Sequence, residues 1–259
     1  MNTEFSGKTV AVTGAGSGMG RAEAQLLASL GAHVWVADID STAGEAVIDQ
    51  IRDKGGAADF HRLDVTDPDA WSRFAEVIDA ADGNLDGLVN NAGVSFRYGI
   101  EDTSVEDWRR VMAINLDSVF YGMRACAPLL KCNGGGSIVN ISSIAGMLGY
   151  FAAAYGASKW GVRGLSKVGA LEFAEHHVRV NSVHPGLVET PLLTSGTTEF
   201  VDESLKSVPA GRSADPDEVA ETVAFLLSDR SPYITGTEIV IDGGLTSGGL
   251  YHRITRELG

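Results

Sequence analysis

The chain has 259 residues, of which 44% are hydrophobic and 32 are glycines. This composition fits one large α/β domain with many tight turns. Lys and Arg number 20 against 34 Asp and Glu, which gives a formal net charge of −14. Because that charge repels polyanions, we expect neither nucleic acid nor an anionic membrane as a partner.

The two cysteines, Cys126 and Cys132, fall on different faces of an expected helix. They therefore predict neither a disulfide framework nor a metal site, and we expect no bound metal. No apolar run approaches the length of a membrane-spanning helix, and the amino terminus lacks a signal pattern. These features predict a cytoplasmic protein.

Short β-rich runs alternate with helical patterns along the chain. The expected strands are Thr9–Thr13, His33–Ala37, Ala58–Leu63, Leu85–Val89, Ser137–Ile141, Val178–Val183 and Glu238–Ile241. The expected helices cover 19–30, 42–53, 68–81, 104–131, 155–175 and 216–228. This alternation predicts an α/β fold, a Rossmann-type doubly wound parallel sheet of about seven strands with helices on both faces. In such a sheet, ligands bind at the carboxyl ends of the strands.

The segment 186–214 has no strong periodicity. A stretch of this length inside a compact domain is usually a functional lid or disordered. No composition shift or linker indicates a second domain, so we expect a single domain over residues 1–259.

A glycine-rich turn follows the first expected strand. Residues 13–20 read TGAGSGMG and lead into a helical pattern. Such glycines permit a tight turn and close approach of the backbone to a pyrophosphate, while the helix start supplies N–H donors. The spacing departs from GxGxxG, because Met19 stands where the third glycine would fall. The turn nevertheless predicts a dinucleotide site formed by Gly14, Ser17, Gly18, Met19 and Gly20.

The second expected strand leads into Asp38, 20 residues after Gly18. A carboxylate at this position can accept hydrogen bonds from the adenosine ribose and would repel a 2′-phosphate. Neither Ser17 nor Ile39 is basic, so the pattern favours NAD over NADP. The alternative is that Asp38 caps the next helix, since Asp38 and Asp40 both precede it.

Two further strand ends carry candidate cofactor residues. Asp64, followed by Val65, ends the third strand region and either contacts the adenine or caps a turn. The fourth strand is followed by Asn91, Ala92 and Gly93, whose small side chains permit close approach to a cofactor.

Tyr155 and Lys159 lie four residues apart, and on a helix they share one face. The ammonium would favour the phenolate and lower the pKa of Tyr155, which suits proton exchange with an alcohol. An isolated YxxxK is more often a helix-start tyrosine and a solvated lysine. Ser142 and Ser143 follow the fifth strand, where a hydroxyl either contacts a substrate oxygen or forms a turn. Asn115, inside an expected helix, either holds a water or caps or kinks that helix.

Together these motifs resemble the short-chain dehydrogenase/reductase family. The resemblance rests on TGxxxGxG at 13–20, NNAG at 90–93, Asn115, ISS at 141–143, YxxxK at 155–159 and Pro185-Gly186. Within the family, four stretches resemble bacterial NAD-dependent 3α/20β-hydroxysteroid dehydrogenases. They are SIVNISSIAG (137–146), YGASKWGVRGLSK (155–167), RVNSVHPG (179–186) and TGTEIVIDGG (235–244).

The resemblance implies a role for each matching residue. Tyr155 is the catalytic acid/base, Lys159 lowers its pKa and holds the nicotinamide ribose, and Asn115 anchors a water-linked proton relay. After Pro185 and Gly186, the residues Val188 and Thr190 contact the nicotinamide carboxamide. A substrate lid covers about 187–212. The family commonly assembles as tetramers, and the small residues at 152–164 would allow the close helix–helix contact that such an assembly needs.

A serine is implied to orient the substrate oxygen, and Ser143 is the preferred candidate. It precedes Tyr155 by 12 residues, one fewer than the resemblance implies, so Ser142 is the alternative. A one-residue deletion in the loop 147–154 is easier to accommodate than a register slip at a buried strand end. The shortened loop weakens the steroid assignment more than the catalytic one.

The leading hypothesis is an NAD-dependent oxidoreductase that interconverts a secondary alcohol and a ketone, such as a hydroxysteroid or another bulky cyclic alcohol. The alternatives are an NADPH-dependent 3-oxoacyl reductase, against which Asp38 argues, and a non-catalytic dinucleotide-binding protein. Eight residues could line an apolar substrate pocket, and they could equally well be ordinary core or lid residues. They are Phe96, Tyr98, Met147, Leu148, Tyr150, Phe151, Leu192 and Leu193.

Overall fold

The structure is a computed structural model, and it describes residues 4–258. Seven parallel strands form one sheet in the order β3-β2-β1-β4-β5-β6-β7. The strands are β1 (Thr9–Thr13), β2 (His33–Asp38), β3 (Ala57–Arg62), β4 (Gly87–Asn90), β5 (Gly136–Ile141), β6 (Val178–Pro185) and β7 (Glu238–Ile241). The sheet confirms the Rossmann-type fold and all seven expected strands, with shifts of one or two residues at several ends.

The helices are α1 (Gly18–Ser29), α2 (Ser41–Asp53), α3 (Pro68–Asp82), α4 (Val105–Met112), α5 (Ser118–Cys132), α6 (Ala153–Phe173), α7 (Pro191–Thr194), α8 (Thr198–Leu205), α9 (Pro216–Leu227) and α10 (Leu245–Leu258). Local sequence explains several of their starts. Asp67 caps α3 ahead of Pro68, and Asp215 forms a capping box with Glu218 at α9.

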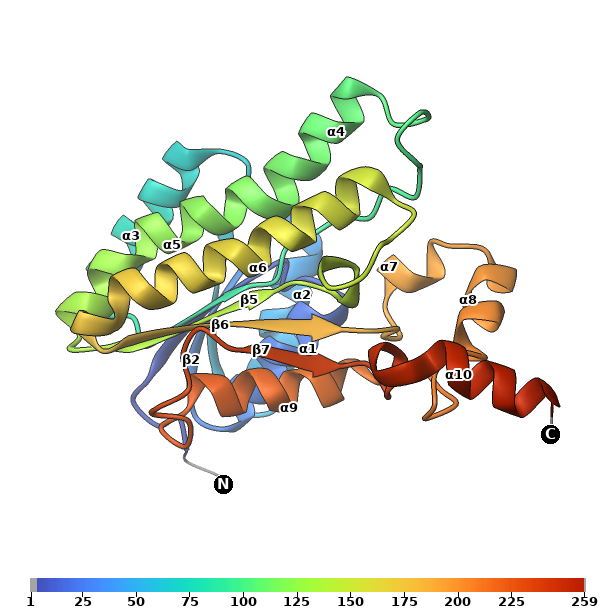
Figure 1. The fold of residues 1–259 in the computed structure, drawn as a ribbon. Helices are drawn as coiled ribbons and strands as arrows, with labels where there is room; N and C mark the ends of the chain where they lie inside the picture. Colours follow the sequence, from blue (N-terminus) through green and yellow to red (C-terminus); the bar gives the residue numbers. More distant parts are fainter. Residues whose placement is uncertain (1–3, 259) are drawn as a thin grey trace.

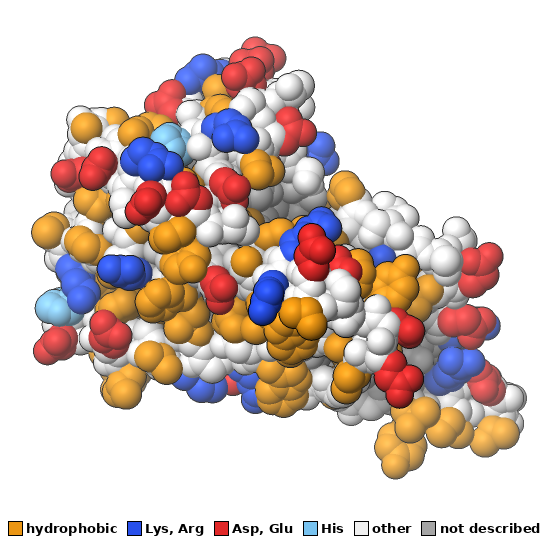
Figure 2. All heavy atoms as spheres, turned by 90° about the horizontal axis from the view of Figure 1, so that it is seen from above, with side chains coloured by type: hydrophobic (Ala, Val, Ile, Leu, Met, Phe, Trp, Pro, Cys, Tyr) orange, Lys and Arg blue, Asp and Glu red, His pale blue; other side chains and the backbone are white. Residues whose placement is uncertain are grey.

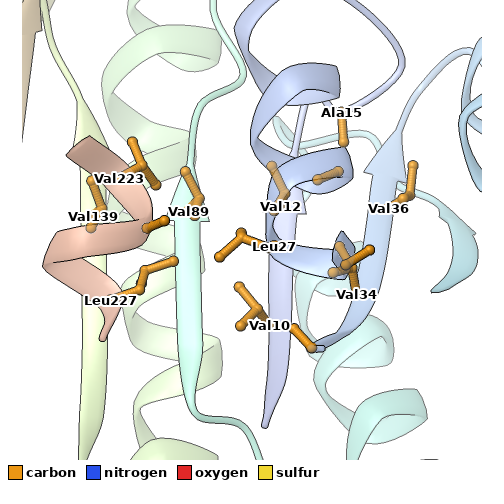
Figure 3. Packing of buried hydrophobic residues seen from close by; sticks show 14 of the residues in the cluster. Val10, Val12, Ala15, Leu27, Val34, Val36, Val89, Val139, Val223 and Leu227 are labelled. Atoms are coloured by element: carbon orange, nitrogen blue, oxygen red, sulfur yellow. The ribbon is translucent and has the colours of Figure 1, made fainter. Parts of the chain in front are cut away.

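Helices cover both faces of the sheet (Figure 1). One face packs against α1, α2 and α9, and the other against α3, α5 and α6. Each face of the sheet has its own hydrophobic core: the first lies under α1, α2 and α9, and the second under α3, α5 and α6. Because side chains alternate between the faces along a strand, Val10 and Val12 of β1 belong to the first core and Ala11 belongs to the second. Figure 3 shows the first core, in which Val10 and Val12 lie close to Leu27 of α1. A strand apolar on both sides is what a doubly covered sheet requires.

The helix expected over 104–131 is interrupted. A π-helical turn, η1 (Ala113–Asp117), separates α4 from α5 and contains Asn115. The segment 186–214 holds the short helices α7 and α8, and the carboxyl-terminal helix α10, which no pattern predicted, extends away from the body (Figure 1). Among residues 4–258, no helix is long and apolar enough to cross a membrane.

Strand order reverses between β1 and β4, since β2 continues the sheet from one side of β1 and β4 from the other. At such a reversal, the connections leaving the two strands diverge and open a crevice outside their carboxyl ends. The candidate site residues follow these same strand ends.

Candidate active site

A cavity of about 720 Å³ lies at the strand-order reversal. This volume lies within the range of small-molecule sites, about 300–1,000 Å³. Most residues expected at a cofactor line it, namely Gly14, Ser17, Gly18, Met19, Asp38, Ile39, Asp64, Val65, Asn91, Ala92, Gly93, Tyr155, Lys159 and Thr190. The sequence interpretation missed Thr66, Val94, Arg110, Ala113, Ile114 and Ser195, which also line it.

The glycine-rich turn between β1 and α1 needs its glycines for two reasons. Gly14 adopts a φ of +63°, and a Cβ there would lie 2.9 Å from the Ala92 Cα. A Cβ on Gly16 would lie 2.9 Å from Oδ2 of Asp38. Ser17, the N-cap of α1, makes no side-chain cap, and the first turn of α1 carries no acidic residue. The helix start therefore offers backbone N–H donors that fit a pyrophosphate.

The segment after β4 is fastened to this turn. Thr13 Oγ1 accepts hydrogen bonds from the backbone N–H groups of Asn91 and Ala92, each at 3.1 Å. The Asn91 side chain donates to the Thr13 carbonyl at 2.9 Å. Gly20 does not line the cavity, because it packs against Asn91 and the Gly14 carbonyl behind the wall. These contacts hold the two halves of the cavity wall together.

Asp38 lines the cavity at the end of β2. Its Oδ2 accepts from the Gly16 N–H at 2.8 Å, and its Oδ1 accepts from the Asp40 N–H at 3.0 Å. Asp40, not Asp38, is the N-cap of α2, since it accepts from the Ala43 N–H at 3.1 Å. Asp40 is therefore the residue that caps α2. Asp38 does not cap the helix, and its hydrogen bond with the glycine-rich turn holds it at the cavity.

Asp64 shows the turn-capping behaviour that the sequence left open. Its Oδ1 accepts from the Thr66 N–H at 2.9 Å and from the Thr66 hydroxyl at 2.7 Å. Both residues also line the cavity. Capping the turn and facing a cofactor are thus compatible at this position.

Tyr155 and Lys159 occupy successive turns of α6, with Nζ of Lys159 5.8 Å from the centroid of the Tyr155 ring. The ammonium donates to the Ile141 carbonyl at 2.9 Å, and burial lowers the pKa of Lys159 to about 8. Burial also raises the pKa of Tyr155, and the neighbouring Ser143 side chain and the charge of Arg97 oppose that rise. The expected lowering of the Tyr155 pKa is therefore wrong in this structure, because desolvation of the phenolate outweighs the favourable partners.

The two serines at the end of β5 have different partners. The Ser142 hydroxyl donates to the Lys159 carbonyl at 2.9 Å. Ser143 Oγ accepts from the Ala145 N–H at 3.1 Å, and the Ser143 side chain acts to lower the pKa of the Tyr155 phenol. This geometry favours Ser143 over Ser142 as the serine beside the reactive phenol.

His184 supports Ser143 from β6, a contact the sequence did not indicate. Its Nδ1 lies 3.1 Å from the Ser143 carbonyl, and its Nε2 lies 2.9 Å from the Ser182 hydroxyl. Burial lowers the pKa of His184, which favours the neutral ring. A carbonyl can only accept, so Nδ1 carries the proton and Nε2 accepts from Ser182.

Asn115 is fully buried and does not line the cavity. Its Oδ1 accepts from the Val94 N–H at 2.8 Å, and its Nδ2 donates to the Val94 carbonyl at 2.9 Å and to Ser158 Oγ at 3.1 Å. Of the alternatives left open, the helix distortion is observed as the π turn η1. The side chain ties the segment after β4 to α6, the helix that carries Tyr155.

A second cavity of about 160 Å³ adjoins the first. Met19, Ser142, Tyr155, Thr190 and Leu192 line both. Ser143, Pro185, Gly186 and Val188 line the second cavity, as do Tyr150 and Leu193 from the expected apolar set. The other expected apolar residues, Phe96, Tyr98, Met147, Leu148 and Phe151, do not line it. Leu187, Phe200 and Ser204 in this wall fall within the expected lid, whereas Ser95, Arg97, Ile144 and Leu245 were not expected there.

Tyr155 thus stands where a dinucleotide-sized cavity meets a smaller, largely apolar one. A neutral phenol at that boundary can give a proton to an oxygen held by Ser143, while the larger cavity fits a nicotinamide dinucleotide through its turn, helix start and Asp38. Fold and site together define the class of Rossmann-type oxidoreductases.

A family model described as enoyl-(acyl carrier protein) reductase matches residues 14–246. The chain is 43% identical to trans-4-hydroxycyclohexanecarboxylate dehydrogenase of Sinomonas cyclohexanicum, over 93% of each chain. It is 42% identical to 3-alpha-(or 20-beta)-hydroxysteroid dehydrogenase of Mycobacterium bovis, over 96% of this chain and 93% of that one. The solved structure of 7 alpha-hydroxysteroid dehydrogenase complexed with NADH and 7-oxo glycochenodeoxycholic acid matches with a TM-score of 0.90, at 33% identity over 94% of this chain and 96% of that one. The chain belongs to the short-chain dehydrogenase/reductase family, which confirms the resemblance found in its sequence.

Proposed function

We propose that the protein is an NAD(H)-dependent dehydrogenase that interconverts a bulky cyclic secondary alcohol and the corresponding ketone. The observation that carries this proposal is the position of Tyr155 in the walls of both cavities, with Ser143 beside it. The names of the relatives support a cyclic substrate, since one acts on a hydroxycyclohexane ring and another on hydroxysteroids.

In the direction of ketone reduction, the Tyr155 phenol gives its proton to the substrate oxygen. Ser143 donates a hydrogen bond to that oxygen, and Lys159 holds a positive charge one helical turn from the phenol. When bound, the nicotinamide supplies the hydride that adds to the carbonyl carbon, and it takes the hydride back in alcohol oxidation. Asn115 positions α6, and its implied part in a proton relay stays a prediction.

The cofactor would be held by residues that line the larger cavity, by three that line the adjoining second cavity, and by Gly20 behind the wall. They are Gly14, Ser17, Gly18, Met19, Gly20, Asp38, Ile39, Asp64, Val65, Asn91, Ala92, Gly93, Tyr155, Lys159, Pro185, Gly186, Val188 and Thr190. NAD is the proposed form because Asp38 presents a carboxylate where a 2′-phosphate would be repelled. Asp38 also argues against the NADPH-dependent 3-oxoacyl reductase.

The quaternary structure that we propose is a homotetramer. Figure 2 shows hydrophobic side chains gathered on the face that α4, α5 and α6 form, and exposed residues there include Phe120, Trp160, Val168 and Leu171. A face with this much exposed apolar surface is a candidate for contact between copies of the chain. Light scattering should give four times the mass of the chain, and a monomer mass would contradict the proposal.

We also propose one domain over residues 1–259, with a substrate lid at about 187–212 built around α7 and α8. A cytoplasmic location is supported by the two cysteines, both of which are free thiols. Cell fractionation tests the location.

The proposed function is tested by following NAD⁺ reduction with a panel of cyclic, steroid, terpene and acyl-thioester alcohols, repeated with NADP⁺. Turnover of cyclic alcohols with a preference for NAD⁺ is the expected result. Turnover confined to 3-hydroxyacyl thioesters with NADP⁺ would favour the 3-oxoacyl reductase. NADH binding with no turnover of any alcohol would favour the non-catalytic alternative.

A further inference from the structure

Arg97 places a positive charge in the wall of the second cavity. It lies in the segment between β4 and α4 and reaches the region of α7. One guanidinium nitrogen donates to Ser195 Oγ at 3.0 Å, and another donates to the Leu192 carbonyl at 2.8 Å. The guanidinium also lies 5.8 Å from the centroid of the Phe200 ring.

The charge of Arg97 has no counter-ion in residues 4–258. None of the ion pairs found there includes it, and no Asp or Glu lines the second cavity. Its Nε–H is buried without a hydrogen-bond partner in the same described range. Burying a cation with an unsatisfied N–H donor costs free energy unless an anion pairs with the charge and accepts the hydrogen bond. In a chain of net charge −14, acidic partners are abundant elsewhere, so their absence here is informative.

Arg97 also lies within electrostatic reach of the reacting groups. Its charge opposes the burial-driven rise in the pKa of Tyr150 and acts in the same direction on Tyr155. The rings of Tyr150 and Tyr155 lie 5.9 Å apart between centroids. Tyr155, Tyr150 and Arg97 line the same cavity, so a ligand whose hydroxyl meets Tyr155 there shares that cavity with the guanidinium.

In a simpler interpretation Arg97 is only a strap, that is, a side chain that holds the lid region around α7 in place and binds no ligand. Its hydrogen bonds to Leu192 and Ser195 fit that function, but both acceptors are neutral, so neither bond requires a positive charge. The strap interpretation leaves the unpaired charge and the orphaned Nε–H unexplained. A guanidinium carries more donors than these contacts use, in a planar fork that matches a carboxylate.

We propose that Arg97 binds a carboxylate of the substrate, so that the preferred substrates are cyclic secondary alcohols that also carry an ionised acid. This inference rests on the proposed function, because it assigns the substrate class of the same site. The fixed charge would act mainly on substrate binding and orientation, whereas Tyr155 and Ser143 act on the oxygen that reacts.

The test compares 4-hydroxycyclohexanecarboxylate with its methyl ester, which keeps the ring and the hydroxyl but removes the charge. The wild type should oxidise the acid with a kcat/KM at least about tenfold above that of the ester, the scale of one charge-assisted hydrogen bond. Arg97→Gln should lower kcat/KM for the acid by about 10- to 100-fold, chiefly through KM, and leave the ester within about threefold. Arg97→Lys, which keeps the charge without the fork, should fall between them.

Two controls separate the explanations. Arg256→Gln removes an exposed positive charge on α10 and should change neither substrate. Cyclohexanecarboxylate, which has no hydroxyl, should inhibit ester oxidation competitively in the wild type and lose that inhibition in Arg97→Gln, even if the variant is less stable. Equal losses for acid and ester in Arg97→Gln would show that Arg97 is only a strap.

The same experiment distinguishes failure of this inference from failure of the proposed function. If the wild type oxidises the ester and other neutral cyclic alcohols without preferring the acid, the carboxylate site is refuted and the proposed function stands. If it oxidises no cyclic alcohol of either kind, the proposed function is refuted and the carboxylate site with it.

Discussion

The Ser142 hydroxyl is committed to the Lys159 carbonyl at 2.9 Å, which leaves the neighbouring Ser143 as the hydroxyl that acts on the pKa of Tyr155. Ser143→Ala should therefore lower kcat by about 10²–10³-fold, the usual cost of removing one donor to a reacting oxygen. Ser142→Ala should keep kcat within a few-fold and reduce the free energy of unfolding by about 1 kcal/mol. Steady-state kinetics and urea unfolding measure the two effects, and the reverse pattern would assign catalysis to Ser142.

The raised pKa of Tyr155 predicts opposite pH dependences for the two directions of the reaction. Alcohol oxidation needs the phenolate, so its kcat/KM should keep rising with pH through the alkaline range up to the raised pKa. Ketone reduction needs the neutral phenol and should not rise over that range; it should fall as the Lys159 ammonium, whose pKa is about 8, loses its charge, and again where the phenol ionises. Kinetics in both directions from neutral to alkaline pH test this, and a plateau of oxidation near neutral pH would show a lowered pKa instead.

Asp38 and Asp40 are separated by one residue but have different partners, so they form a matched pair of substitutions. Asp38→Ala should reduce the preference for NAD⁺ over NADP⁺ in kcat/KM by about 100-fold, since it removes a ribose acceptor and the repulsion of the 2′-phosphate. Asp40→Ala should leave the preference unchanged and cost about 1 kcal/mol of stability through loss of the α2 cap. A preference unaffected by Asp38→Ala would remove Asp38 from cofactor selection.

Glu23 of α1 predicts a pH-dependent loss of stability away from the reaction. Its side chain is fully buried, neither carboxylate oxygen has a hydrogen-bond partner within residues 4–258, and burial raises its pKa from 4.5 to about 8. Between these values the folded chain keeps a proton that the unfolded chain loses, so the free energy of unfolding falls as pH rises from 4.5 to about 8. Glu23→Gln removes this dependence.

The stability advantage of Glu23→Gln over the wild type should therefore grow across that window, by on the order of 3 kcal/mol. Urea unfolding of both proteins at pH values near the two ends of the window measures it. An advantage that stays constant with pH would mean that Glu23 is ionised in the folded protein.

Most of the sheet could be predicted from the sequence because its inner strands are buried on both faces and leave short apolar runs between turn signals, although the edge strands β3 and β7 are only partly buried. The helices α7 and α8 were missed because they have four and eight residues, too few to show a period, although Thr190 and Thr197 cap them. In α10, Gly248 has non-helical backbone angles and interrupts the helix. Leu250 and Leu258 are exposed, so the apolar residues of α10 do not mark a buried face and show no helical period in the sequence.

The candidate site shows a similar division. Tyr155, Lys159 and the glycine-rich turn have fixed spacings in the chain, and their placement followed from local geometry. Arg97 and His184 act through partners 95 and 41 residues away, at Leu192 and Ser143, and no spacing reveals such contacts. The pKa of Tyr155 depends on how deeply the folded chain buries it, which the pattern YxxxK does not contain.

The central claim is that Tyr155 transfers the proton at the substrate oxygen. Tyr155→Phe removes only the phenolic oxygen and keeps the ring that lines both cavities. Oxidation of a cyclic alcohol that the wild type turns over, followed as NADH formation, should fall by at least about 10³-fold in kcat, while the Kd of NADH should change by less than about threefold. A Tyr155→Phe enzyme that binds NADH normally and retains activity within about tenfold of the wild type would contradict the claim.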